Sequence, residues 1–196
     1  MKKHVVRIVG GDYRKTPIAV VDAPGLRPTP DRVRETLFNW LRHFWGGDYA
    51  DKQVLDLFAG TGALGFEAAS HGVAHVQLVE LNPSAVAALR ALRSRLKAEN
   101  VRIHAGDALA VLDRLDRAAF DLVMLDPPFD QGWLDRVYPR LPGVLRPDGL
   151  LYIESEAALE PPAGFQLLRQ SRAGQVHFHL LRFAAMQKTD NNPAIS

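Results

Sequence analysis

The chain has 196 residues, 47% of them apolar and 23% charged, which is the size and composition of one ordinary α/β domain or a domain with a short extension. It contains no cysteine, which excludes a disulfide scaffold, a thiol nucleophile and any metal site held by thiolates. No apolar run reaches the roughly 18 residues of a membrane span, and Arg7 interrupts the first apolar stretch too early for a signal peptide. We therefore expect a cytoplasmic protein.

The net charge of +2 conceals an uneven distribution. Residues 1–42 hold nine Lys and Arg residues against four acids, whereas the remainder of the chain is mildly acidic. Such a basic segment favours contact with a polyanion. Composition alone fits an ordinary solvated charged face equally well, so both interpretations stay open.

Near the N-terminus the pattern predicts a hairpin followed by a helix. Residues 5–9 alternate loosely before two glycines and predict a short strand, with which residues 18–21 pair. Thr29 is a good N-cap, Pro30 suits the first helical position, and apolar residues then recur at helical spacing until Gly46. The apolar stripe is expected in the core, and the opposite side of this helix carries Arg32, Arg34 and Asn39.

From residue 53 onward, predicted strands alternate with predicted helices. The strands are expected at 54–58, 75–80, 101–105, 120–125 and 150–155, and the helices at 63–71, 83–97, 108–115 and 133–141. This alternation predicts a parallel sheet covered on both faces. The last two strands, at 166–172 and 175–183, have no helix between them and predict an antiparallel hairpin that closes one edge of the sheet.

The first chemical motif is the glycine turn after residues 54–58. Gly60, Gly62 and Gly65 match the dinucleotide-binding fingerprint, and Glu80 ends the next strand, where it is placed to grip ribose hydroxyls. A nicotinamide-dependent oxidoreductase is therefore a real alternative. Against it, the Asp56 carboxylate repels a pyrophosphate and suits a cation such as the ammonium of a methionine moiety, and no later segment resembles a hydride-transfer site. A tight turn without any ligand is the third interpretation.

The second motif is Asp126-Pro127-Pro128-Phe129, directly after an apolar strand. Two prolines there either simply end the strand or form part of a ligand site. The second interpretation is favoured by the position, because open α/β sheets bind ligands at the carboxyl ends of their strands. The Asp126 carboxylate and the Pro127 carbonyl together offer two acceptors to one substrate amino group. Such acceptors favour a pyramidal nitrogen whose lone pair is free to attack a methyl group, and they stabilise the developing positive charge. Phe129 offers a stacking face for an extracted base.

The glycine motif resembles the first motif of class I S-adenosylmethionine-dependent methyltransferases. The resemblance implies that the loop lies against the methionine and ribose of the cofactor, that Glu80 takes the ribose and that Asp107 holds the adenine amino group. From its residues alone, Asp107 is equally well a helix N-cap. The implied cofactor residues are Thr29, Asp56, Phe58, Ala59, Gly60, Thr61, Gly62, Glu80, Leu81, Asp107, Ala108 and Asp126.

The second motif resembles the Asp/Asn-Pro-Pro-aromatic signature of methyltransferases that act on planar amino groups. With the arginine-rich stretches at 7–14 and 25–40, the chain from about residue 5 to 183 resembles the bacterial 16S rRNA guanine-966 N2-methyltransferase family. One small departure is Thr61, where serine is more usual. The resemblance implies methyl transfer to the exocyclic N2 of that guanine in the small ribosomal subunit, with S-adenosylhomocysteine as product. It implies catalytic roles for Asp126, Pro127, Pro128 and Phe129, and RNA contacts by Arg7, Arg14, Arg27, Arg32 and Arg34.

The resemblance also implies an α/β Rossmann-like class I methyltransferase fold with a seven-stranded, mostly parallel sheet. We expect a basic hairpin and helix at 1–46, the methyltransferase domain at 47–185 and a disordered tail at 186–196. Alternatives with the same chemistry are a DNA adenine N6- and a protein glutamine N5-methyltransferase, and a catalytically silent RNA-binding module is a further one. No histidine pair has metal-ligand spacing and a carboxylate partner, so we expect no metal. We also expect a monomer.

Overall fold

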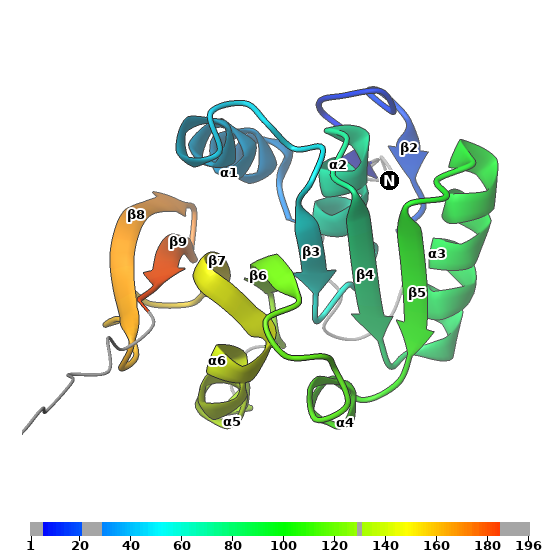
Figure 1. Ribbon diagram of the computed structural model, residues 1–196. Coiled ribbons are helices and arrows are strands. Elements are labelled where there is room, and N and C mark those ends of the chain that lie inside the picture. The colour runs from blue at the N-terminus through cyan, green and yellow to red at the C-terminus, as the bar shows by residue number, and fades with distance from the viewer. Residues whose placement is uncertain (1–5, 21–28, 129–130, 185–196) are drawn as a thin grey trace, which may run out of the picture.

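The computed structural model describes residues 6–20, 29–128 and 131–184. Its elements, in chain order, are β1 (Val6–Arg7), β2 (Pro17–Ile18), α1 (Asp31–Phe44), β3 (Gln53–Asp56), α2 (Ala63–Ser70), β4 (His75–Glu80), α3 (Pro83–Leu96), β5 (Val101–Ala105), α4 (Ala108–Leu112), β6 (Phe120–Leu125), α5 (Trp133–Val137), the 3-10 turn η1 (Tyr138–Arg140), α6 (Leu141–Val144), β7 (Leu145–Ser155), β8 (Phe165–Ala173) and β9 (Val176–Phe183). Figure 1 shows their arrangement. The tail predicted at 186–196 lies outside the described residues.

The central sheet has seven strands in the order β5-β4-β3-β6-β7-β9-β8. The first five of these are parallel to one another, and β9 runs antiparallel to both β7 and β8. The predicted parallel sheet and its C-terminal antiparallel hairpin are therefore confirmed. The strand order reverses at β3, so the carboxyl ends of β3 and β6 lie at the switch point where such sheets bind ligands.

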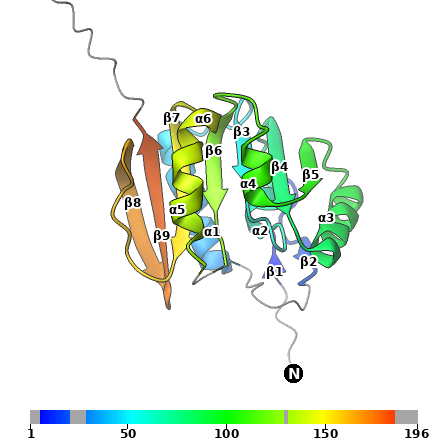
Figure 2. The ribbon, with the colours of Figure 1, turned by 90° about the horizontal axis from the view of Figure 1, so that it is seen from below.

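Helices cover both faces of the sheet (Figure 2). Alternate side chains of each central strand point to opposite faces, so Val54 joins one buried cluster and Leu55 the other. The first cluster also contains apolar residues of α1, α2 and α3, and the second those of α4, α5 and α6. The helix predicted at 133–141 is broken into α5, η1 and α6, because Pro139 and Pro142 lack the N–H that a continuous helix needs.

The N-terminal segment packs into the same core as the sheet. The predicted hairpin is confirmed, with Val6 opposite Ile18, and both side chains belong to the cluster that α1 also joins. The predicted N-cap role of Thr29 is wrong. Pro30 is the residue before the helix, and the Thr29 hydroxyl donates instead to Glu154 at 2.9 Å. Within the described residues, no helix is both long enough and apolar enough to cross a membrane.

Candidate active site

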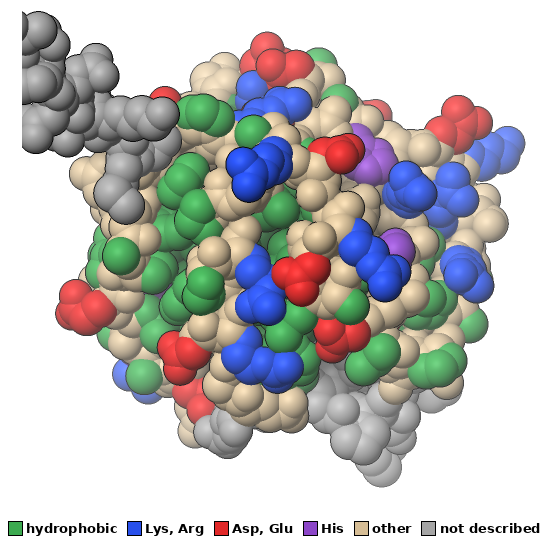
Figure 3. All heavy atoms as spheres, turned by 60° about the horizontal axis from the view of Figure 1, so that its bottom comes forward, with side chains coloured by type: hydrophobic (Ala, Val, Ile, Leu, Met, Phe, Trp, Pro, Cys, Tyr) green, Lys and Arg blue, Asp and Glu red, His purple; other side chains and the backbone are tan. Residues whose placement is uncertain are grey.

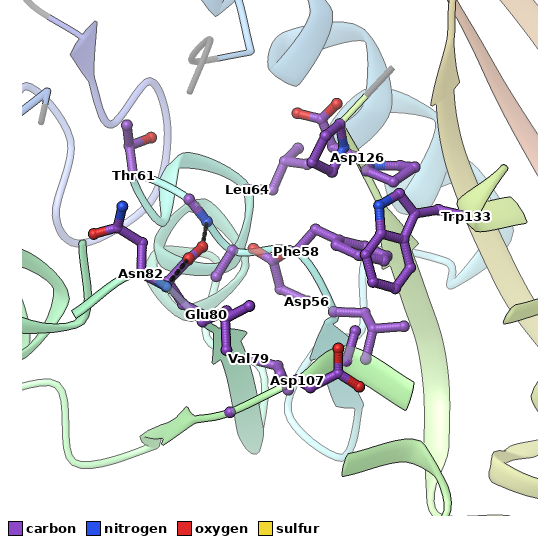
Figure 4. Close-up of a pocket in the computed structure, with 18 of the residues that line it drawn as sticks. Asp56, Phe58, Thr61, Leu64, Val79, Glu80, Asn82, Asp107, Asp126 and Trp133 are labelled. Atoms are coloured by element: carbon purple, nitrogen blue, oxygen red, sulfur yellow. Dashed lines mark hydrogen bonds between the residues drawn. The ribbon is translucent and has the colours of Figure 1, made fainter. Parts of the chain in front are cut away.

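A cavity of about 490 Å³ opens where the carboxyl ends of β3, β4 and β6 meet. Eleven of the twelve residues predicted to contact the cofactor line it, and so do Pro127 and Pro128 of the second motif. The exception is Gly62. Phe129 is outside the described residues. Figure 4 shows Asp56, Glu80, Asp107 and Asp126 around one space, with Trp133 on its far side. The two motifs, far apart in the sequence, thus face the same cavity.

The glycine turn is held in place by Glu80. The backbone N–H groups of Gly60 and Asn82 each donate to one oxygen of this carboxylate at 2.7 Å (Figure 4). Gly62 has a φ of 79°, and a Cβ there would lie 2.5 Å from Leu89 and 2.8 Å from Phe66. Only glycine accommodates both the left-handed backbone and the close packing. Gly62 therefore shapes the turn and is not part of the cavity surface.

Asp56 lies at the end of β3 with only 1% of its surface exposed. The Gly65 N–H donates to its Oδ2 at 3.0 Å, while Oδ1 is buried without any hydrogen-bond partner. Burial, with smaller contributions from the nearby charges of Glu80 and Glu154, raises the pKa of Asp56 to about 7. A buried acceptor without a donor next to a cavity fits a ligand that brings a cation or an N–H group, as the ammonium of a methionine moiety does.

The sequence context of Asp107 left two interpretations open, a helix N-cap and an adenine contact. Its Oδ1 accepts from the N–H groups of Leu109 and Ala110 at 3.0 Å, so it is the N-cap of α4. The residue also lines the cavity, next to Gly106 and Ala108. The helix cap is confirmed, and the adenine contact stays a prediction.

Asp126 follows β6 at the cavity wall and is partly exposed. Burial raises the pKa of Asp126 well above its ordinary range, and the nearby charges of Glu154 and Asp56 raise it further. Three carboxylates of the same sign are thus gathered at the ends of three neighbouring strands. Acids of like charge held this close repel one another when ionised, and groups with perturbed pKa values in a cavity are typical of functional sites.

Sequence reasoning missed several residues of this site. Glu154 and Tyr152 are buried on β7, and the available signal was an acid at the end of an apolar strand. Trp133 packs edge-on against Phe58 with a centroid separation of 5.2 Å, and its indole N–H donates to Gln131 at 3.0 Å. An aromatic residue after a proline motif carries no signal that places it in a cavity.

The RNA contact predicted for Arg34 is wrong, because this side chain is fully buried. Its Nη2 donates to Asp31 Oδ1 at 2.5 Å and to the Arg7 carbonyl at 2.7 Å, and its Nη1 lies 3.6 Å from Glu67 Oε2. Glu67 in turn accepts from the N–H groups of Val9 and Gly10. Arg34 therefore joins α1, α2 and the N-terminal segment. The side chains of Arg7, Arg14 and Arg32 are exposed, and Arg27 lies outside the described residues.

No group of three or more His, Asp or Glu residues is arranged to hold a metal ion in the part of the chain that the structure describes. His71 stacks on Phe38 with ring centroids 4.6 Å apart, and burial lowers the pKa of His71. His71 and Phe38 therefore contribute to packing.

Comparison with known proteins places the chain in a family. The model of the family described as conserved hypothetical protein 95 matches residues 6–182. The ribosomal RNA small subunit methyltransferase D of Escherichia coli is 40% identical over 94% of this chain and 93% of its own length, and that of Haemophilus influenzae is 35% identical over 91% and 94%. A putative methyltransferase structure from Escherichia coli superposes with a TM-score of 0.80 at 37% identity, covering 92% of this chain and 98% of the other.

Several more distant structures share the fold, and one of them, a putative methyltransferase 18% identical with a TM-score of 0.61, was solved in complex with SAH. The methyltransferase relatives at 37–40% identity support the predicted cofactor, S-adenosylmethionine. The chain therefore belongs to the conserved hypothetical protein 95 family, together with the small subunit methyltransferases D, and has the Rossmann-like class I methyltransferase fold.

Proposed function

We propose that the protein transfers a methyl group from S-adenosylmethionine to the exocyclic N2 amino group of guanine 966 in 16S ribosomal RNA. The observation that carries the proposal is that Asp126 and Pro127 line the same cavity as the glycine turn and Glu80. The motif proposed to bind the substrate amine and the motif proposed to bind the methyl donor thus line one cavity. The relatives named ribosomal RNA small subunit methyltransferase D support RNA as the substrate class.

The residues that would hold the cofactor fit its polar groups. Asp56 offers a buried oxygen without a partner, and Glu80 offers a carboxylate next to the Gly60 turn. Leu81 is 66% exposed at the cavity mouth and gives an apolar surface for a ring. When bound, S-adenosylmethionine supplies an electrophilic methyl group, so the protein has to align the amine and stabilise charge rather than provide a strong base.

Asp126 and the Pro127 carbonyl would receive the two hydrogens of the substrate amine. In this role they hold the nitrogen in a fixed orientation and oppose the positive charge that develops on it. Phe129, with Pro128, would present the face against which the base stacks. These assignments follow from the motif and from the cavity that the motif lines.

RNA phosphates would be contacted by Arg7, Arg14, Arg27 and Arg32 of the N-terminal segment. Figure 3 brings forward the side at the bottom of Figure 1, where α4, α5 and α6 lie, and basic and acidic side chains are interspersed on this face. A mixed surface gives weak attraction on its own, so the N-terminal arginines would add the net positive charge that an RNA backbone requires. The proposed enzyme is a cytoplasmic monomer that needs no metal ion.

Labelled methyl transfer into total RNA tests the proposal. The RNA should come from cells that lack the protein, so that the target position is unmodified, and the labelled base is then mapped. We expect one methylated guanine in 16S RNA, at N2. Total DNA and total protein from the same cells serve as parallel substrates. Label in adenine N6 of DNA or in glutamine of a protein would overturn the proposed substrate while leaving the methyltransferase assignment in place.

A further inference from the structure

The hairpin formed by β8 and β9 carries positive charge without any negative charge. Residues 165–183 contain no acidic residue and three basic ones, here called the hairpin arginines: Arg169, Arg172 and Arg182. Residues 43–196 as a whole hold 15 basic and 18 acidic residues, so 12 basic residues stand against 18 acids once the hairpin is set aside. The hairpin is therefore a basic element in an otherwise acidic part of the chain.

The turn of this hairpin lies at the cavity end of the sheet. Because β9 runs antiparallel to β7, its first residues lie beside the last residues of β7, and Ser155 is opposite His177. His177 is in turn opposite Arg172 of β8. Figure 2 shows the turn at the edge toward which the arrowhead of β6 points. Three strand spacings separate β6 from β8, so β8 lies about 14 Å from the strand that leads into Asp126.

The hairpin arginines are held in place but have no acidic partners. The guanidinium carbons of Arg169 and Arg182 lie 5.1 and 5.7 Å from the centroid of one ring, that of Phe44 in α1. Arg172 is exposed next to the turn, and its Nε donates to the Gly174 carbonyl at 2.7 Å. No acid in the described ranges forms an ion pair with any of the three. Guanidinium groups that are not paired with carboxylates are suited to bind phosphates.

The N-terminal segment lies on the other side of the cavity. The N–H groups of Asp12 and Tyr13 donate to Ser70 at the end of α2, and Arg95 of α3 donates to the Pro17 carbonyl. These two helices pack on β3, β4 and β5, whereas β7, β9 and β8 follow on the other side of β6. In Figure 1, β2 and α3 accordingly lie on one side of the molecule and β8 and β9 on the other. Basic residues therefore flank the cavity from both sides along the sheet.

We propose that the hairpin arginines form a second RNA-contacting surface. They bind phosphates on one side of the target nucleotide, while the N-terminal segment binds phosphates on the other side. The inference rests on the proposed function, because that function makes RNA the substrate. When a base is extracted into a cavity, its neighbours in the strand stay outside. Phosphate contacts on both flanks then fix the register of the strand without reading its sequence.

A purely protective role for the same charges makes a different prediction. β8 is the last strand of the sheet, and charged side chains on such an edge prevent pairing with other chains. That role is served by either sign of charge at any place along the strand. The hairpin instead carries only positive charge, and Arg172 stands at the cavity end. Both features favour a polyanion as the partner.

The salt dependence of binding to unmodified 16S RNA tests the surface. In a triple variant, each hairpin arginine is replaced by glutamine, which removes the charge and keeps an unbranched stem: Arg169→Gln, Arg172→Gln and Arg182→Gln. Each phosphate contact contributes about 0.7–0.9 to the slope of log affinity against log salt, so the slope should fall by about 2.1–2.7. The ratio of affinities at 50 and 200 mM salt should then change by about 20–40-fold.

The matched control removes the same amount of charge elsewhere. It replaces by glutamine three exposed arginines that line a separate cavity on α3 and β5: Arg90, Arg93 and Arg102. Its slope should equal that of the wild type. Arg172→Gln alone keeps the test decisive if the triple variant is unstable, because Arg172 is exposed and is not one of the two arginines over Phe44. This single variant should lower the slope by about 0.7–0.9. Calorimetry with S-adenosylhomocysteine identifies any variant whose fold has changed.

Fragments of 16S RNA shortened stepwise from either side of the target nucleotide test the placement. Shortening from one side should remove the difference in affinity between the wild type and the triple variant, and shortening from the other side should leave it. A difference that survives shortening from both sides would contradict a contact with one flank. A loss of affinity for the assembled small subunit without a loss for RNA alone would mean that the hairpin meets a ribosomal protein, which also overturns the RNA surface.

The same measurements separate this inference from the proposed function. If the wild-type protein transfers no methyl group to RNA, the proposed function fails. If it methylates RNA, but neither Arg172→Gln nor the triple variant lowers the slope, only the second surface fails. An equal fall of the slope in the α3 control would likewise show that the hairpin has no special place in RNA binding.

Discussion

Among the described residues, charged side chains gather in two places, and they do so in opposite ways. At the carboxyl end of the sheet, Asp56, Asp126 and Glu154 are like charges gathered beside a cavity. Between α1 and α2, the fully buried Arg34 faces the acid Glu67 and does not line the cavity at the carboxyl end of the sheet. Removing one partner of a buried pair of opposite charges is strongly destabilising. Acids of like charge gathered beside a cavity, with raised pKa values, are instead typical of functional sites. The comparison separates a functional region from a structural one.

Breaking the buried Arg34–Glu67 pair should have the largest effect, and the effect should be on stability. Arg34→Met removes the buried cation and leaves the Glu67 carboxylate without its partner, so we expect a loss of about 3–5 kcal/mol in the free energy of unfolding. Urea titration followed by circular dichroism measures it. The matched control is Arg32→Met, two residues earlier on the same helix but exposed, where the change should stay under about 1 kcal/mol. Equal losses in the two variants would mean that Arg34 is not a structural anchor.

In the functional region, Asp126→Ala should lower methyl transfer by about 10²–10³-fold, as expected for one preorganised polar partner. Stability should not fall by the amount expected for Arg34→Met, because removing one of three like charges relieves repulsion. Calorimetry should show little change in cofactor affinity. Asp126→Asn is the informative second variant, since its amide oxygen accepts a hydrogen bond but takes up no proton. Turnover of the alanine variant within threefold of wild type would contradict a role at the reacting amine.

The same contrast explains what could be predicted from the sequence. Local patterns were sufficient for the alternating strands and helices and for the final hairpin, because periodicity and turn residues act over a few positions. They were also sufficient for the two motifs, whose residues share one edge of a parallel sheet. The helix predicted at 133–141 failed for a local reason, its two prolines, but the two wrong side-chain roles involve distant partners. Arg34 meets Glu67 33 positions later and Thr29 meets Glu154 125 positions later, so neither role is visible in the local pattern.

Substitutions at Glu80 test whether the same cavity binds the cofactor. Glu80→Ala removes a carboxylate that would bond ribose hydroxyls and that also receives the N–H groups of Gly60 and Asn82. We expect S-adenosylmethionine binding to weaken by about 1.5–3 kcal/mol, the usual contribution of a hydrogen bond to a charged group. Calorimetry measures this directly. Glu80→Gln keeps the shape and one acceptor oxygen, so its cofactor affinity should lie between those of the wild type and Glu80→Ala. Unchanged affinity in both variants would leave Glu80 with a structural role alone.

The raised pKa of Asp56 predicts that cofactor affinity depends on pH, with a smaller effect than that of Glu80→Ala. Its pKa of about 7 in the cofactor-free protein means that the carboxylate gains its charge as pH rises through that value. A cationic ligand group binds the charged form better, so cofactor affinity should increase with pH, by about tenfold between pH 6 and 8. In Asp56→Asn the affinity should be lower and nearly independent of pH over that range. A wild-type affinity that falls as pH rises would show that Asp56 does not face the cation.

Substitution of single exposed arginines in the N-terminal segment should have the smallest effect, a change in RNA affinity that corresponds to one phosphate contact each. Arg7→Ala and Arg14→Ala should each reduce the slope of log affinity for 16S RNA against log salt by about 0.7–0.9, which changes the ratio of affinities at 50 and 200 mM salt by about threefold. Cofactor affinity should not change, because phosphate contacts position the RNA without touching the methyl donor. Arg93→Ala on α3 is the matched control, because Arg93 is an equally exposed arginine outside the segment and lies with Arg90 and Arg102 around a second cavity. If the slope falls for Arg93→Ala and not for Arg7→Ala or Arg14→Ala, the RNA runs along α3 and the basic N-terminal segment is only a solvated face.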